Sequence, residues 1–105
     1  AGTRKEATWS EAIQKAVEEL KEFSSNEIAI IASARMTNEE LFLARRLTNA
    51  LGVGEIDVVP RNGAPDGFLV AEDRNPNTTA ALLFKITGEA TGSRLPIIAS
   101  GVKSG

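Results

Sequence analysis

The segment SARMTNEE, residues 33–40, has the residue types of an anion-binding turn. It follows an apolar run at residues 28–32 and precedes an amphipathic stretch, so a strand would end and a helix begin here. Because the first amides of a helix are unpaired, a phosphate could bind over residues 33–38. The segment has no glycine that would let a backbone approach a pyrophosphate, and Glu39 and Glu40 would repel an anion. The residues alone favour helix capping over ligand binding.

Charged residues around a long irregular segment form a second candidate group. Paired carboxylates can support acid–base chemistry or hold Mg²⁺. The spacing of these carboxylates matches no calcium-loop pattern, and solvated loop charges are the favoured interpretation. Arg61 and Arg74 flank the same segment and could hold phosphates or form salt bridges with the carboxylates. The acidic members of the group are Asp57, Asp66, Glu72 and Asp73.

The composition excludes several kinds of site. The 105 residues include no Cys and no His, so this chain alone cannot form a thiolate metal site, a disulfide or a His-based triad. Net charge is −2 with both signs interspersed, which predicts no nucleic-acid partner and no binding to an anionic membrane surface, and no direct membrane insertion is expected. The longest apolar run is too short to cross a bilayer, and the polar start resembles no signal peptide, so a cytoplasmic setting is expected.

Hydrophobic periodicity predicts the elements that would position these groups. Thr8 and Glu11 form a capping box for a helix over residues 9–23, with Trp9 as the first member of its core stripe. A strand buried on both faces follows at residues 27–32, then a helix at residues 38–51 that ends at Gly52. A second strand at residues 56–59 ends at Pro60.

The second half of the chain is less regular. Residues 60–76 predict a long loop, with at most a short extended piece at residues 68–71. Asn75 and Pro76 would start a third helix that ends at Gly88 and turns Ala80 and Leu83 inward. Residues 95–99 could form a strand or a short helix. Residues 1–7 are expected to be a disordered terminus, and residues 8–105 a single α/β domain.

Five stretches, in this order, resemble the molybdopterin oxidoreductase superfamily: WSEAIQKAVEELKEF, IAIIASARMTNEELFLARRL, GVGEIDVVPR, DGFLVAEDRNPNTTAA and IIASGVKSG. Together they cover residues 8–104. They look most like the large iron–sulfur subunit of bacterial respiratory NADH:quinone oxidoreductase (complex I). They are similar, more weakly, to formate dehydrogenases, which carry a comparable T-N-E-E turn.

The resemblance implies an internal domain of a larger subunit. The fold would be a Rossmann-like three-layer α/β unit with a short parallel sheet and helices on both faces. SRLPIIASG would be a helix, with the next strand starting after Lys103. The parent protein would be an oxidoreductase whose iron–sulfur clusters are held by cysteines N-terminal to this segment, whereas the fragment itself would hold no cofactor or metal and no catalytic residue. It would contact other domains and subunits in the cytoplasmic peripheral arm of a membrane-associated complex.

The resemblance also implies a set of binding residues. Family members that carry molybdenum contact a molybdopterin guanine dinucleotide partly through strand-to-helix loops. The matching positions in this chain are Ser33, Arg35, Thr37, Asn38 and Glu39, with Arg61, Asn75 and Asn77 as weaker candidates. The related domains of the complex I subunit generally hold no molybdenum cofactor.

Three hypotheses follow. The chain is a non-catalytic structural domain of the iron–sulfur subunit of a respiratory NADH:quinone oxidoreductase, which in the intact complex transfers electrons from NADH to quinone. Alternatively, it is the molybdopterin guanine dinucleotide-binding part of a formate dehydrogenase-like enzyme. The third hypothesis, independent of any resemblance, is a free-standing α/β binding or regulatory module.

Overall fold

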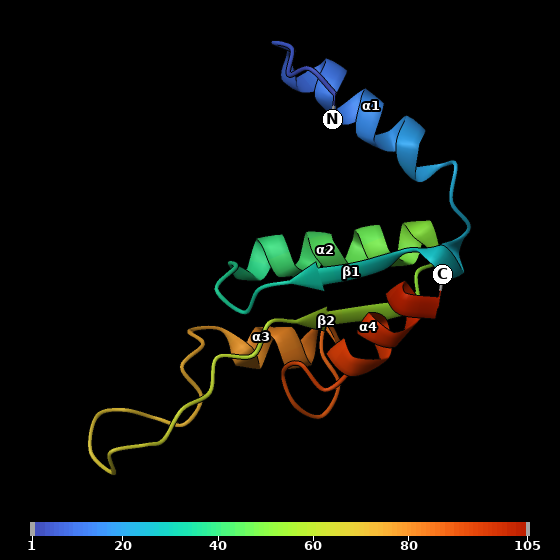
Figure 1. Ribbon diagram of the computed structural model, residues 1–105. Helices are drawn as coiled ribbons and strands as arrows, with labels where there is room; N and C mark the ends of the chain where they lie inside the picture. Colours follow the sequence, from blue (N-terminus) through green and yellow to red (C-terminus); the bar gives the residue numbers. More distant parts are fainter. Residues whose placement is uncertain (1, 105) are drawn as a thin grey trace.

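Two short parallel strands joined through a helix form the centre of the molecule. The computed structural model describes residues 2–104 and is of mixed α/β class (Figure 1). Strand β1 (Ala29–Ala32) leads through α2 (Asn38–Leu51) to β2 (Glu55–Val58), and the two strands pair in parallel. Strand β1 begins two residues later than predicted, because residues 25–27 form the 3-10 turn η1 (Ser25–Glu27) instead of extended chain. Strand β2 lies one residue earlier than predicted.

The register determines which side chains share a face of the sheet. Ile30 pairs with Ile56, and Ile31 pairs with Asp57. Paired residues of parallel strands point to the same side, so Ile30 and Ile56 share one face while Ile31 and Asp57 share the other. The prediction that the first strand is buried on both faces is wrong for β1, because Ile31 is 55% exposed. In β2, by contrast, three consecutive residues are buried.

The predicted bounds of α2 are confirmed. Thr37 and Glu40 form a capping box at its start, and Gly52 ends it in the left-handed conformation at φ 65°. Leu41 is fully buried, but Phe42 and Leu47, on the same apolar side, remain about half exposed. A two-stranded sheet is too narrow to cover the whole apolar side of this helix.

The hydrophobic core lies between α2, α3 (Thr78–Leu83) and one face of the sheet. Its buried side chains come from α2, from β2, from α3 and from the turns beside them. Ile30 and Ala32 of β1 pack against it while staying partly exposed. The members of this core are Ala34, Leu41, Ile56, Val58, Ala80, Ala81 and Ile86.

Helix α1 (Trp9–Leu20) forms but lies apart from this core. Its predicted capping box is present, with Thr8 N donating to Glu11 Oε2 at 2.7 Å. The helix ends at Leu20 rather than at residue 23. The prediction that Trp9 belongs to the core is wrong, because its side chain is 85% exposed and no residue of α1 is buried. Figure 1 shows α1 standing away from the sheet and the other helices.

The last two helices, α3 and α4, differ in how well they agree with the predictions from the sequence. Helix α3 is shorter than predicted and begins at Thr78, with Asn77 rather than Asn75 at its N-cap. Ala80 is buried as predicted, but Leu83 points into solvent. Helix α4 (Leu95–Ser104) confirms the helical interpretation of SRLPIIASG, while the strand expected after Lys103 would lie largely outside the described residues. Among residues 2–104, no helix is long and apolar enough to cross a membrane.

Residues 60–76 form a projection, here called the arm (Figure 1). Its neck is closed by an antiparallel bridge between Asn62 and Asp73, and by the Arg74 amide donating to the Arg61 carbonyl at 2.8 Å. At the tip, Asp66 Oδ1 accepts the amides of residues 68, 69 and 70 at 2.8–2.9 Å. The extended piece predicted at residues 68–71 is absent, because this carboxylate folds the tip into a turn.

Candidate functional site

The turn at residues 33–40 connects β1 to α2 and holds most of the predicted binding residues. Thr37 N donates to Glu40 Oε2 at 2.8 Å, and Glu40 N donates back to Thr37 Oγ1 at 3.2 Å. Ser33 Oγ accepts the Arg35 amide at 3.2 Å. Three of the turn's amides are therefore satisfied by its own side chains.

A second segment closes the turn from the other side. Asn77 N donates to the Ala34 carbonyl at 2.9 Å. The Asn77 side-chain amide donates to the Met36 carbonyl and to Asn38 Oδ1, both at 3.0 Å. The structure thus brings Asn38 and Asn77, 39 residues apart in the chain, into direct contact. They bind each other and hold α3 against the start of α2.

Other predicted binding residues lie elsewhere or face solvent. Arg35 and Glu39 are exposed side chains on the turn. Arg61 is exposed at the neck of the arm. Asn75 donates both its backbone and its side-chain amide to Asp73 Oδ1, at 3.0 and 2.9 Å, which is why it does not cap α3. Asn75 Oδ1 is buried and makes no hydrogen bond.

These contacts do not fit a dinucleotide cradle. Three amides that could face a phosphate, those of Arg35, Thr37 and Glu40, are already bound by side chains of the turn. The segment also has no glycine between β1 and the end of α2, so side chains surround the backbone at every position. Two carboxylates, Glu39 and Glu40, stand in the first turn of the helix.

Thr37→Ala is expected to lower the free energy of unfolding by about 1 kcal/mol, because the Glu40 amide loses its acceptor. Urea denaturation of the isolated chain measures this loss. Thr37→Ser keeps the hydroxyl oxygen and should retain most of the stability. An equal loss in both variants would contradict the capping role of the hydroxyl.

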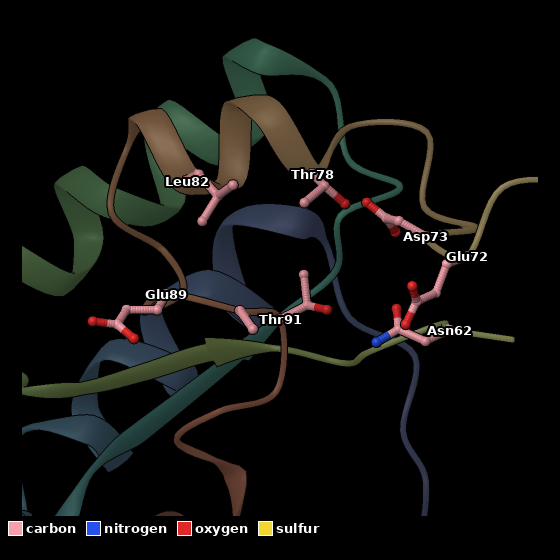
Figure 2. Close-up of a pocket in the computed structure, with 8 residues that line it drawn as sticks. Asn62, Glu72, Asp73, Thr78, Leu82, Glu89 and Thr91 are labelled. Atoms are coloured by element: carbon pink, nitrogen blue, oxygen red, sulfur yellow. The ribbon is translucent and has the colours of Figure 1, made fainter.

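A hollow of about 240 Å³ lies between the arm, α3 and the segment that follows α3 (Figure 2). Three carboxylates reach it, and Figure 2 shows Glu89 on the opposite side from Glu72 and Asp73. Within residues 2–104, no group of three acidic side chains is arranged to hold a metal ion. The hollow is lined by Asn62, Glu72, Asp73, Thr78, Leu82, Glu89, Ala90 and Thr91.

The Asp73 carboxylate at the edge of the hollow is held in its charged form. The Thr78 hydroxyl has the largest effect on its pKa, which is lowered, and the amides of Asn75 act in the same direction. The Thr78 oxygen is buried and directed toward Asp73, although no hydrogen bond of regular geometry joins them. The salt bridges suggested for Arg61 and Arg74 are absent from the described part of the chain. Arg74 instead donates to the Ala64 carbonyl at 3.2 Å.

Asp57, which the sequence grouped with the solvated loop carboxylates, is a buried polar centre. Its side chain is completely buried on β2, beneath the segment that leads into α4. Oδ1 accepts the Thr87 hydroxyl at 2.7 Å and the amides of Val58 and Gly92 at 2.7 and 3.1 Å. Oδ2 accepts the Arg94 amide at 2.6 Å. One carboxylate therefore anchors a segment 30 to 37 residues away.

Two opposing influences act on the pKa of Asp57. Burial favours the neutral acid and raises the pKa, but the hydrogen bonds from Thr87 and the three amides favour the anion and outweigh it. The net effect lowers the pKa below its usual value of 3.8. The interpretation of Asp57 as a solvated loop charge is wrong. An acidic residue between Ile56 and Val58, within an apolar strand, was the available signal.

Comparison of the chain with protein-family models, with curated proteins and with solved structures found no match.

Proposed function

We propose that this chain is a Rossmann-like three-layer α/β unit. It serves as a non-catalytic structural domain of the large iron–sulfur subunit of a bacterial NADH:quinone oxidoreductase. The family named in this proposal rests on the resemblance of five ordered stretches of the sequence. Several polar groups of the turn and the carboxylate of Asp57 are engaged in internal hydrogen bonds, which supports a structural role.

The observation that carries the proposal is the amount of surface that the chain leaves exposed. A folded monomer of 11.1 kDa exposes about 5,700 Å². This chain exposes 8115 Å², and its radius of gyration is 16.2 Å, against about 13 Å for a compact domain of this length. The excess, about 2,400 Å², is of the size that permanent subunit interfaces bury. A domain built into a larger assembly would cover such a surface.

The tip of the arm is the most exposed apolar part of this surface. Phe68 and Leu69 are 88% and 81% exposed. The Asp66 carboxylate already fixes the backbone that presents them. A preformed turn loses little conformational entropy when it binds, so these two side chains suit a contact with a neighbouring domain.

The test is made in the intact complex that contains this chain. Replacing Phe68 and Leu69 together by Ser is expected to lower the yield of assembled complex, because roughly 2–4 kcal/mol of apolar burial would be lost. NADH oxidation with an artificial electron acceptor should be unchanged per assembled complex. The matched control, Phe68→Leu with Leu69→Met, keeps the apolar area and should assemble normally.

Two results would contradict the proposal. Normal assembly of the double Ser variant would show that the arm is not an interface. Normal assembly with lost NADH oxidation would show a catalytic role.

The guanine dinucleotide alternative has its own measurement. Amide chemical shifts of residues 33–39 can be followed while a guanine nucleotide is added to the isolated chain. Because the turn is closed by Glu40 and Asn77, no shift change is expected at millimolar nucleotide. Saturable changes confined to this turn would favour a cofactor-binding domain.

A further inference from the structure

Helix α1 has an apolar stripe with nothing packed on it. Trp9, Ile13 and Val17 follow one another at helical spacing and are all exposed, with Leu20 at the end of the same stripe. The charged side chains, including the Lys15–Glu19 ion pair, lie on the opposite side. Helices of 12 residues are marginal in water without tertiary contacts. The apolar stripe of α1 is therefore expected to pack against another apolar surface.

The sheet has one face that is only half covered. On the face that carries Asp57, β2 is buried beneath the segment leading into α4. On the same face of β1, Ile31 is 55% exposed, and Ala29 is exposed as well. Parallel sheets are normally covered on both faces, because their strands are apolar on both sides. This face of β1 lacks a helix.

The connection between the two surfaces allows them to meet. Residues 21–28 separate α1 from β1, eight residues where helix-to-strand links commonly have two to six. The helix is about 18 Å long and the strand about 13 Å, so α1 can fold back antiparallel to β1 and cover it along its whole length. The charged side of α1 then stays in water.

We infer that α1 is a strap that closes over the open face of β1, with its Trp9–Val17 stripe packed on Ile31. The open arrangement in Figure 1 is one state of this strap and the closed arrangement is the other. The occupant of the face is α1 of the same chain, because an eight-residue link keeps it at a high effective concentration. Closure would bury part of the exposed surface cited for the proposed function, but it leaves the tip of the arm exposed, so the tests of the two proposals are separate.

Trp9 makes the closure measurable. It is the single tryptophan of the chain, and the chain has no tyrosine, so intrinsic fluorescence reports on α1 alone. In the 105-residue chain at low micromolar concentration, the emission should be blue-shifted and the acrylamide quenching several-fold weaker than in a peptide of residues 2–23. Equal emission and quenching in chain and peptide would overturn the inference.

Two substitutions locate the contact. Ile31→Lys should return the emission and quenching to those of the peptide, because a charge would occupy the face. Leu83→Lys, the same kind of change at an exposed site on α3, should leave them unchanged. Ile13→Lys disrupts the strap from the α1 side and cannot unfold the core, so it serves if Ile31→Lys fails to fold. Fluorescence that is insensitive to both Ile31→Lys and Ile13→Lys would overturn the inference.

Light scattering identifies which copy supplies the strap. A monomer with blue-shifted Trp9 at every concentration is the expected result. A blue shift that appears only as a dimer forms would overturn the intramolecular closure, since α1 would then cover the β1 of a second copy.

Discussion

Asp57→Asn is expected to lower the free energy of unfolding by roughly 3 kcal/mol, a large share of the 5–15 kcal/mol typical of a domain. The Asn oxygen can replace Oδ1 and keep the bonds from Thr87 and Gly92. Its NH₂ group would then face the Arg94 amide, which now lies 2.6 Å from Oδ2. A donor would stand against a buried donor, and the start of α4 would lose its anchor. Urea denaturation measures the loss.

Asp66→Asn is the matched control for this prediction. Asp66 also accepts three backbone amides, but all three bind one oxygen and the side chain is exposed. An Asn oxygen can accept the same three amides, and water can solvate the NH₂ group. The control should therefore change stability much less than Asp57→Asn. Similar losses in the two variants would mean that burial of the Asp57 carboxylate has no special effect.

The lowered pKa of Asp57 predicts how this difference depends on pH. Burial raises the pKa of Asp57, but the Thr87 hydroxyl and the three amides lower it by more than burial raises it. The folded protein therefore binds this proton less readily than the unfolded chain. The stabilisation is complete above the unfolded pKa of about 3.9 and disappears as pH falls through the lower folded value. The stability gap between the native chain and Asp57→Asn should therefore narrow below about pH 4. A gap independent of pH would show that folding does not change the pKa of Asp57, and a gap that widens below pH 4 would show that the folded chain raises it.

Gly92→Ala is expected to destabilise the chain by roughly 2–4 kcal/mol, because strain and overpacking add. Gly92 has φ +77°, a region that L side chains rarely adopt. A Cβ built there would meet the ring of Pro60, 2.7 Å from both Cδ and Cγ. Relief of this clash would move the Gly92 amide away from Asp57.

Gly67→Ala separates the contribution of backbone strain from that of overpacking. Gly67 has nearly the same φ, +76°, but nothing lies within 4 Å of the position that its Cβ would take. The control should show the backbone strain alone, a loss of about 1–2 kcal/mol. Chemical denaturation of both variants gives the comparison. Equal losses would mean that Pro60 moves without resistance.

Local sequence signals correctly predicted where α1 and α2 begin. The Thr8–Glu11 and Thr37–Glu40 capping boxes are both present, and α2 runs from Asn38 to Leu51 and is ended by Gly52, as expected. Capping depends on residues three apart, so the sequence contains all of its determinants. The start of α3 was predicted at the wrong residue, because a second local contact competes with capping. Asn75 has the right residue type for a cap, but Asp73 takes its amide groups.

The polar centre and the burial pattern depend on contacts that no local pattern contains. The partners of Asp57 lie as far as 37 residues away, in the segment between α3 and α4. Trp9 shows the complementary error. Its spacing correctly indicates one side of an amphipathic helix, but spacing does not say whether anything packs on that side. The apolar pattern of the sequence describes surfaces available for burial, and the structure shows that only part of them is used within residues 2–104.

The narrow neck of the arm determines where this chain can accept inserted residues. The arm leaves the body and returns to it at neighbouring points, joined by the Asn62–Asp73 bridge and the bond between Arg61 and Arg74. Extra residues inserted at its tip would not move the strands or helices. The closure entropy grows slowly, by about 0.6 kcal/mol for each doubling of loop length. The tip is therefore the place where this domain can accept an insertion, such as an epitope or a new recognition segment, while the rest of the fold stays the same.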